Sequence, residues 1–159
     1  MDYGLKNSEF QYINVRREIF SETFLKKNIE DYKIYCFHGE PKYIRVQQKN
    51  IGQAGKINNY YNLKWELTDI ETGLPFFYRR PDIIFPKPKN LDLMIYYARK
   101  LSSEFVFVRV DFYNINGKIY LGELTFTPSN VLFKLKNYKQ SIYMGKYIDI
   151  KKIKKYLFN

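Results

Sequence analysis

Apolar and polar residues alternate along several short stretches of the chain, which is the pattern of half-buried β-strands. Residues 31–37 and 42–47 alternate in this way on either side of a tight turn at 38–41 that contains glycine and proline. They predict a β-hairpin. An apolar run at 105–112 and the segment 117–128 flank another short turn, so the sequence predicts a second hairpin.

The segments outside these hairpins are less regular. Residues 17–25 alternate well enough to predict a strand, although Ile19 and Phe20 could equally begin a buried core strand. Residues 48–59 are rich in Gln, Asn and Gly and predict a loop. Residues 60–67 are expected to be extended.

Helices complete the predicted fold. Asn90 is expected to cap a helix that follows a proline-rich loop and packs one apolar face on the second hairpin. That face consists of Leu91, Met94, Ile95, Ala98 and Leu101. A basic helix is expected from Asp149 to about Phe158. The fold class is therefore expected to be α+β, with a mainly antiparallel sheet of two hairpins and at least two helices.

Charged residues interrupt the apolar pattern of the second hairpin. Arg109 and Asp111 lie two apart, so a strand points both side chains to one face. Glu123 and Thr125 share a face of the returning strand in the same way. A strict two-residue Asn-Gly loop would turn Glu123 away from Asp111, whereas a three-residue or bulged loop centred on Gly117 sets the two opposite each other. We predict the second register.

These charges have two possible explanations. An unpaired buried charge is costly, so Arg109 could form a structural ion pair with Asp111 or Glu123. Alternatively, the two carboxylates could belong to a divalent-cation site. Mg²⁺ takes oxygen ligands from one or two carboxylates and from phosphates, and arginine suits the phosphates that such a metal bridges.

Three phrases carry a family resemblance. The phrases DYKIYCFHGEPKYI, KPKNLDLMIYYARKLSSEFVFVRVDFY and GKIYLGELTFTPS occur in this order between about Glu9 and Gly145. Together they resemble the TupA-like ATP-grasp family of bacterial surface-polysaccharide clusters. The second hairpin resembles the metal-binding hairpin of ATP-grasp ligases, so the fold implied is the C-terminal lobe of an ATP-grasp domain.

The resemblance implies a carboxylate–amine ligase that uses ATP and Mg²⁺ through an acyl-phosphate intermediate. In that reaction Arg109 would stabilise the transferring phosphoryl group, and Asp111 and Glu123 would hold the metal. Thr125 stands at the third ligand position, where most ATP-grasp enzymes have asparagine.

The resemblance also implies a nucleotide site. Glu22 would lie beside the adenine amino group, the backbone of Thr23 and Leu25 would form the adenine hinge, and Asp31 would bind the ribose. Glu22 and Asp31 could equally be solvated charges at strand ends. Leu121, taken to share a strand face with Glu123, would pack beneath the base.

The chain departs from the family pattern in two further ways. Ser141 stands where the family usually has an aspartate, and no V-[IV]-K-P-like strand precedes the hinge. The sequence 1–159 is therefore expected to be a single partial domain without the N-terminal ATP-clamp portion, which a complementary chain could supply.

Composition adds limits on partners and location. The chain has 27 Lys+Arg against 16 Asp+Glu, a net charge of +11, which favours anionic partners. No apolar run approaches the roughly 20 residues of a membrane span, and no signal peptide is visible. The single cysteine, Cys36, is expected to be a buried neutral thiol, which fits a cytoplasmic location.

Several functions stay open on these observations. The first is a ligase of cell-surface polysaccharide biosynthesis that acts on an amino-acid or glycan carboxylate. The alternatives are a truncated remnant that at most binds nucleotide, and a glycosyltransferase-associated capsule protein. A basic module that binds nucleic acid or glycan is disfavoured, because most aromatic residues alternate as core residues and do not line one exposed face.

Overall fold

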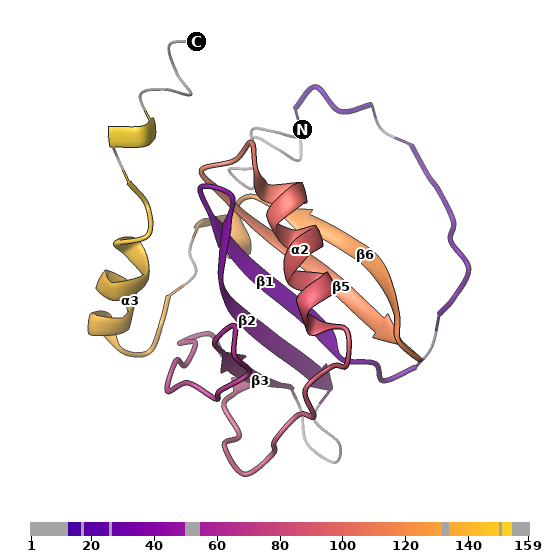
Figure 1. The fold of residues 1–159 in the computed structure, drawn as a ribbon, viewed down its shortest axis with the longest axis horizontal. Coiled ribbons are helices and arrows are strands. Elements are labelled where there is room, and N and C mark those ends of the chain that lie inside the picture. The colour runs from indigo at the N-terminus through magenta and orange to yellow at the C-terminus, as the bar shows by residue number, and fades with distance from the viewer. Residues whose placement is uncertain are drawn as a thin grey trace.

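The computed structural model describes residues 13–16, 18–25, 27–49, 55–131, 134–149 and 151–153 of the chain. In these residues six strands form one sheet in the order β4-β3-β2-β1-β5-β6 (Figure 1). The strands are β1 (Asp31–Phe37), β2 (Glu40–Lys49), β3 (Lys56–Tyr61), β4 (Phe77–Tyr78), β5 (Phe107–Ile115) and β6 (Lys118–Thr125). Every pair is antiparallel except β3 with β4. The predicted α+β class and both hairpins are confirmed.

Each hairpin closes through two residues with positive φ. These are His38 (49°) and Gly39 (79°) in the first hairpin, and Asn116 (52°) and Gly117 (80°) in the second. Two positive φ values define the type I′ turn, whose twist matches that of the flanking strands. The two hairpins join through β1 and β5, so residues about 78 positions apart in sequence become cross-strand neighbours.

The predicted register of the second hairpin is confirmed, because Asp111 lies opposite Glu123. The predicted cause is wrong, because the turn is a strict two-residue loop and the extra residue is Gly122 on β6. A Cβ at Gly122 would lie 3.0 Å from the Tyr113 ring and 3.3 Å from the Asp111 carbonyl oxygen. Glycine therefore lets the bulge form beside these groups.

Helix α2 (Leu91–Ser102) covers one face of the sheet (Figure 1). The predicted apolar face is confirmed, with Leu91, Met94 and Ala98 fully buried. Asn90 precedes the helix, but its side chain makes no capping hydrogen bond. Its amide nitrogen donates to the Gly117 carbonyl (2.8 Å), and its oxygen accepts from the Asn114 amide (2.6 Å), so Asn90 ties the helix to the second hairpin.

The two faces of the sheet have separate cores. Under α2 the buried set includes Tyr32, Ile34, Cys36, Ile44, Val46, Ile57, Tyr61, Val108, Val110 and Phe112. On the opposite face a smaller cluster packs beneath helix α3 (Tyr138–Gly145), which the sequence did not predict. That cluster consists of Tyr35, Phe37, Tyr43, Tyr60, Ile70, Leu135 and Met144. The 3-10 helix η2 (Pro128–Val131) leads from β6 toward α3.

Several local predictions need correction. Residues 18–25 form no strand, because no strand among the described residues pairs with this segment, and the Ile19 and Phe20 side chains are 103% and 81% exposed. Residues 56–61 are strand β3, not loop, and pair with β2. Of the predicted terminal helix, only residues 149 and 151–153 are described, and the Lys151 amide donates to Asp149 Oδ1 (2.9 Å). Ile150 and residues 154–158 of this helix lie outside the described residues. Arg17, the first residue of the predicted strand 17–25, also lies outside them.

No helix among the residues placed by the structure is long and apolar enough to cross a membrane. The Cys36 side chain is free of disulfides and fully buried beneath α2, and burial raises the pKa of its thiol to about 12. The expected buried neutral thiol is confirmed.

Candidate functional site

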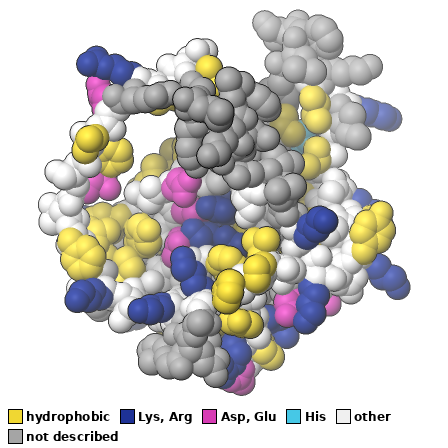
Figure 2. All heavy atoms as spheres, turned by 180° about the vertical axis from the view of Figure 1, so that it is seen from behind, with side chains coloured by type: hydrophobic (Ala, Val, Ile, Leu, Met, Phe, Trp, Pro, Cys, Tyr) yellow, Lys and Arg dark blue, Asp and Glu magenta, His cyan; other side chains and the backbone are white. Residues whose placement is uncertain are grey.

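A charged cluster lies in the middle of the sheet face opposite α2. Lys33 on β1 is the cross-strand neighbour of Asp111 on β5, and Arg109 lies two residues before Asp111 on the same strand. The three side chains are between 4% and 10% exposed. Figure 2 shows basic and acidic side chains gathered near the centre of this face, with apolar side chains beside them. The sheet register therefore creates this cluster from distant parts of the sequence.

Asp111 is the centre of this hydrogen-bonded cluster. Arg109 Nε donates to Asp111 Oδ1, and Arg109 Nη2 donates to Oδ2, both at 2.7 Å. Lys33 Nζ donates to the same Oδ2 at 2.6 Å and pairs with Asp31 at 2.5 Å. Arg109 Nη2 also donates to Thr125 Oγ1 at 2.8 Å. The ion pair of Arg109, one of the two explanations that the sequence left open, is present with Asp111 and is bidentate.

The environment keeps Arg109 charged. Burial alone lowers the pKa of its guanidinium, but hydrogen bonds to Asp111 and the charge of that carboxylate oppose this effect, so the pKa stays above its ordinary value. A buried cation held in this way is stabilised only while its partner carboxylate is ionised. The cluster is therefore a coupled unit of fixed charges.

The arrangement does not fit Mg²⁺ at Asp111. Both oxygens of this carboxylate already accept hydrogen bonds from cationic side chains, and Thr125 Oγ1 accepts one from Arg109. Glu123 lies opposite Asp111, but its side chain is 57% exposed and 3.7 Å from Arg109 Nη2. No group of three or more His, Cys, Asp or Glu residues in the described part of the chain could hold a metal ion. Metal binding here would require the Arg109–Asp111 pair to separate.

A second set of buried polar groups on this face was missed by sequence reasoning. Arg45 on β2 is 6% exposed, and its guanidinium carbon lies 5.8 Å from the centre of the Tyr35 ring. Arg45 Nε and both amide atoms of Asn58 have no hydrogen-bond partner among the described residues. Buried polar groups normally have partners, so this patch is suited to a ligand that supplies them.

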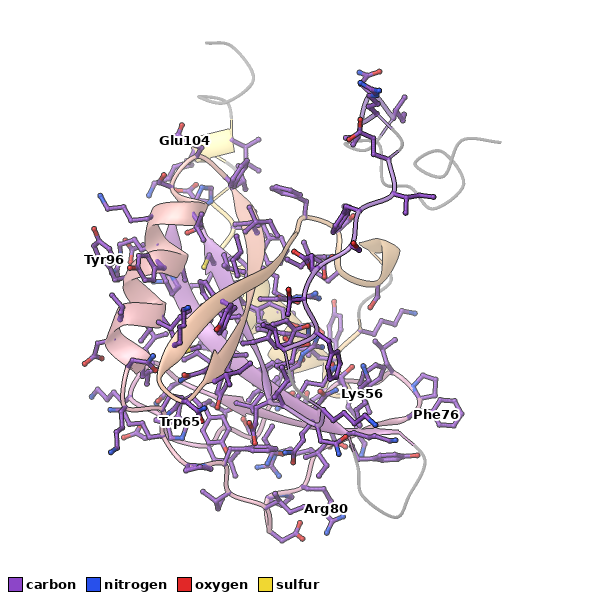
Figure 3. The ribbon with its side chains drawn as sticks, turned by 90° about the vertical axis from the view of Figure 1, so that its right-hand side faces the viewer. Lys56, Trp65, Phe76, Arg80, Tyr96 and Glu104 are labelled. Atoms are coloured by element: carbon purple, nitrogen blue, oxygen red, sulfur yellow. The ribbon has the colours of Figure 1, made fainter. Side chains whose placement is uncertain are left out.

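A cavity of about 610 Å³ lies at one end of the charged cluster. Its walls come from the segment 18–25, from the start of β1 and from β2, β3 and β5. The lining residues are Phe20, Glu22, Thr23, Phe24, Leu25, Asn28, Ile29, Asp31, Gln47, Gln48, Lys49, Lys56 and Tyr113. Seen from the side, the segment 18–25 lies on the opposite side of the sheet from Tyr96 of α2, and Lys56 lies near that segment (Figure 3).

This cavity brings together four residues that the family resemblance selected. Glu22, Thr23 and Leu25 form one wall, and Asp31 belongs to the same cavity. Asp31 Oδ2 pairs with Lys33, whereas Asp31 Oδ1 accepts no hydrogen bond from any described residue. Asp31 therefore links the cavity to the charged cluster and keeps one acceptor atom for a ligand.

Leu121 does not lie where the sequence placed it. The bulge at Gly122 sets Leu121 opposite Phe112 and Glu123 opposite Asp111. Cross-strand partners point to the same face, so Leu121 lies on the α2 face and Glu123 on the other. The predicted shared face is wrong, and Leu121 does not line the cavity.

A comparison with family models identifies the family of the chain. The model of the TupA-like ATP-grasp family matches residues 2–149. The chain therefore belongs to the TupA-like ATP-grasp family, whose membership implies the use of ATP. No curated protein and no solved structure matches the chain.

The sequence does not mark Lys33 and Arg45 as buried. Each alternates with the apolar residues that pack under α2, as Arg109 does on β5, so the pattern places all three on the opposite face of the sheet. Alternation alone predicts that face to be exposed to solvent. Their partners could not be found from the sequence, because the pairing of β1 with β5 joins residues far apart in the chain.

Proposed function

We propose that this protein binds ATP on the sheet face opposite α2, with the base and ribose in the 610 Å³ cavity and the phosphates toward Lys33 and Arg109. The observation that carries the proposal is the order of groups along β1. Asp31 belongs to the cavity, and Lys33, two residues on, belongs to the charged cluster. A nucleotide presents a ribose and then phosphates in the same order.

The cavity walls supply groups that suit each part of the nucleotide. The hinge assignment gives the adenine edge to the backbone of Thr23 and Leu25, with Glu22 beside the amino group. Asp31 Oδ1 accepts from a ribose hydroxyl.

The proposed reaction is the carboxylate–amine ligation of ATP-grasp enzymes, in cell-surface polysaccharide biosynthesis. A substrate carboxylate oxygen attacks the γ-phosphorus of ATP, the bond to the bridging oxygen breaks, and ADP leaves with the electron pair. The amine then attacks the acyl phosphate, forms the amide and releases phosphate. In our proposal Arg109 and Lys33 position the transferring phosphoryl group and balance its charge.

One observation favours a second candidate, a nucleotide-binding protein without ligase activity. The Asp111 carboxylate already pairs with two cations at 2.6–2.7 Å, and their positive charges oppose the approach of Mg²⁺. A protein that retained the family fold but not its metal would bind ATP and not turn it over. Measurement of ADP release with amino-acid carboxylates and amines separates the two candidates.

Calorimetric titration with a non-hydrolysable ATP analogue tests the shared part of both candidates. We expect the analogue to bind wild type and to bind Lys33→Met about tenfold or more weakly, because a charge-assisted phosphate contact is lost. Adenosine should bind both proteins equally. The matched control is Lys64→Met, which removes an exposed lysine that makes no described ion pair. A folded wild type that does not bind the analogue would exclude nucleotide binding.

If the protein were instead a basic module that binds nucleic acid, we would expect a different result. Oligonucleotide binding would then fall steeply with salt, and Lys33→Met and Lys64→Met would weaken it similarly.

A further inference from the structure

A second cavity, of about 310 Å³, lies on the same sheet face, beside helix α3. Its walls come from the ends of β1 and β5, from the segment after β6, and from α3 and the residues around it. The lining residues are Tyr35, Phe37, Phe107, Phe126, Thr127, Pro128, Leu135, Ser141, Met144, Gly145 and Ile148. It shares no residue with the larger cavity at Asp31.

This second cavity is mostly apolar. Polar atoms enter its wall only from a few hydroxyl groups and the backbone, because the remaining lining side chains are aromatic or aliphatic. Small-molecule sites typically have this composition and start at about 300 Å³. An apolar cavity of about 150 Å³ already admits benzene, so this one has room for a ring and a short chain.

The order of groups along the strands relates this cavity to the nucleotide site. Along β1, Asp31 lies in the larger cavity, Lys33 in the charged cluster and Tyr35 in the apolar cavity. Along β5 the same order runs from Tyr113 through Arg109 to Phe107. Residues i and i+2 of a strand point to the same face and are about 7 Å apart. The apolar cavity therefore begins about 7 Å beyond Lys33 and Arg109, the two cations that face the phosphates in our proposal.

Arg45 lies at the border between the two regions, because it is the cross-strand neighbour of Lys33 and contacts the Tyr35 ring. Arg45 lies against the Tyr35 ring, makes no ion pair with any described carboxylate and has an unpartnered Nε. A partly buried arginine stays protonated, so its charge needs an anion. The Asn58 amide nitrogen is also unpartnered, but Asn58 lies opposite Gln47, on the side of Arg45 toward the larger cavity. The Arg45 guanidinium is therefore the group that suits a carboxylate next to the apolar cavity.

We propose that the apolar cavity binds the side chain of the carboxylate substrate, and that this substrate carries an aromatic or branched aliphatic group. This inference rests on the proposed ligase function. The carboxylate lies toward Arg45 and the charged cluster, where it faces the γ-phosphate, and the apolar group lies among Phe37, Phe107 and Met144. The cavity therefore selects a hydrophobic acid over a small polar one.

Methionine-methyl NMR tests this proposal directly. Met144 lines the apolar cavity, whereas Met94 is buried under α2 on the opposite face and serves as an internal reference. We expect 3-phenylpropionate to shift the Met144 methyl resonance saturably and to leave that of Met94 unchanged. Propionate should bind about tenfold or more weakly, because it lacks the ring. Equal shifts of both methionines, or no shift of Met144, would overturn the proposal.

Gly145→Leu places a larger side chain at the exposed edge of the cavity. Gly145 lines the cavity, and a Cβ there meets no heavy atom within 4 Å, so the leucine side chain is accommodated without a clash. We expect this variant to fold, to bind the ATP analogue as wild type does, and to lose 3-phenylpropionate binding. Unchanged binding of 3-phenylpropionate to Gly145→Leu would place the ligand elsewhere and overturn the proposal.

Arg45→Met tests the carboxylate contact. We expect it to weaken 3-phenylpropionate binding about tenfold and to leave binding of the neutral 3-phenylpropanamide unchanged. Equal effects on the acid and the amide would overturn the charge assignment. Wild type that binds 3-phenylpropionate but not the ATP analogue would support the carboxylate cavity and overturn the nucleotide function, so the two failures are distinguishable.

Discussion

The two faces of the same sheet bury their side chains for different purposes. The face under α2 is apolar, and Ile34, Val108 and Val110 are fully buried there. The opposite face buries Lys33, Arg45, Arg109 and Asp111, which are all charged. Burial of apolar surface stabilises a fold directly, whereas buried charges stabilise it little or not at all against apolar replacements. The α2 face therefore contributes the larger apolar core, and under the proposed function the charged side chains of the other face are retained for binding.

Asp111→Ala should have the largest effect on stability. It leaves Arg109 and Lys33 buried without their shared carboxylate, so we expect a loss of about 3–5 kcal/mol in the free energy of unfolding. Urea denaturation measures this loss. The control is Glu123→Ala, which removes a half-exposed carboxylate on the same face and should change stability by less than about 0.5 kcal/mol. Equal losses for the two variants would contradict the central role of Asp111.

Ile34→Ala tests the opposite face. Ile34 is fully buried beneath α2, and its truncation should lower the free energy of unfolding by about 3 kcal/mol through lost burial and the cavity left behind. The folded protein should bind the ATP analogue normally. Ile84→Ala is the control, since Ile84 is 63% exposed and should lose less than about 0.5 kcal/mol. Weaker nucleotide binding by folded Ile34→Ala would show that the faces are not independent.

Cys36 gives the α2 face a defined pH dependence. Burial raises the pKa of the thiol from its model-compound value of 9.0 to about 12, so the unfolded chain releases this proton at a lower pH than the folded protein does. The stabilisation is complete below pH 9 and is lost as the pH rises from 9 toward 12. We expect a slope of up to about 1.4 kcal/mol per pH unit from this group. Urea titrations from pH 8 to 10 should show a shallower loss for Cys36→Ala, and an identical slope would contradict the assignment.

Arg45→Met should have the smallest effect on stability and the opposite sign. Arg45 has no described carboxylate partner, so replacement by an apolar side chain of similar length should leave stability unchanged or raise it by about 1 kcal/mol. Arg109→Met should be destabilising, because it removes the bidentate partner of Asp111. Thermal and urea unfolding of the two variants side by side measure the contrast. A marked loss for Arg45→Met would assign Arg45 a structural role.

Much of the sheet could be predicted because its pattern is local. Alternation located both hairpins, and the apolar positions of α2 follow helical spacing. The segment 18–25 alternates equally well, yet it has no neighbouring strand to pair with, and alternation alone cannot supply one. Helix α3 was missed because Met144 is its only buried residue, so its sequence has little periodicity to detect.

The candidate site was predicted in part for a similar reason. Arg109 and Asp111 stand out within one strand, and the Gly122 bulge restores the expected pairing with Glu123. The contact of Lys33 with Asp111 depends on which hairpin strands meet in the sheet, and the sequence contains no local sign of that choice. The same contact places a second cation beside the carboxylate that the family resemblance assigns to the metal.

One variant tests the central claim most directly, that the charged face is retained for binding and not for stability. Lys33→Met, Arg109→Met and Asp111→Leu together replace the buried ion network with apolar side chains of similar size. We expect the free energy of unfolding of this triple variant to lie within about 1 kcal/mol of wild type or above it, and calorimetry to detect no binding of the ATP analogue. A triple variant that loses several kcal/mol of stability, or that binds the analogue as wild type does, would contradict the account.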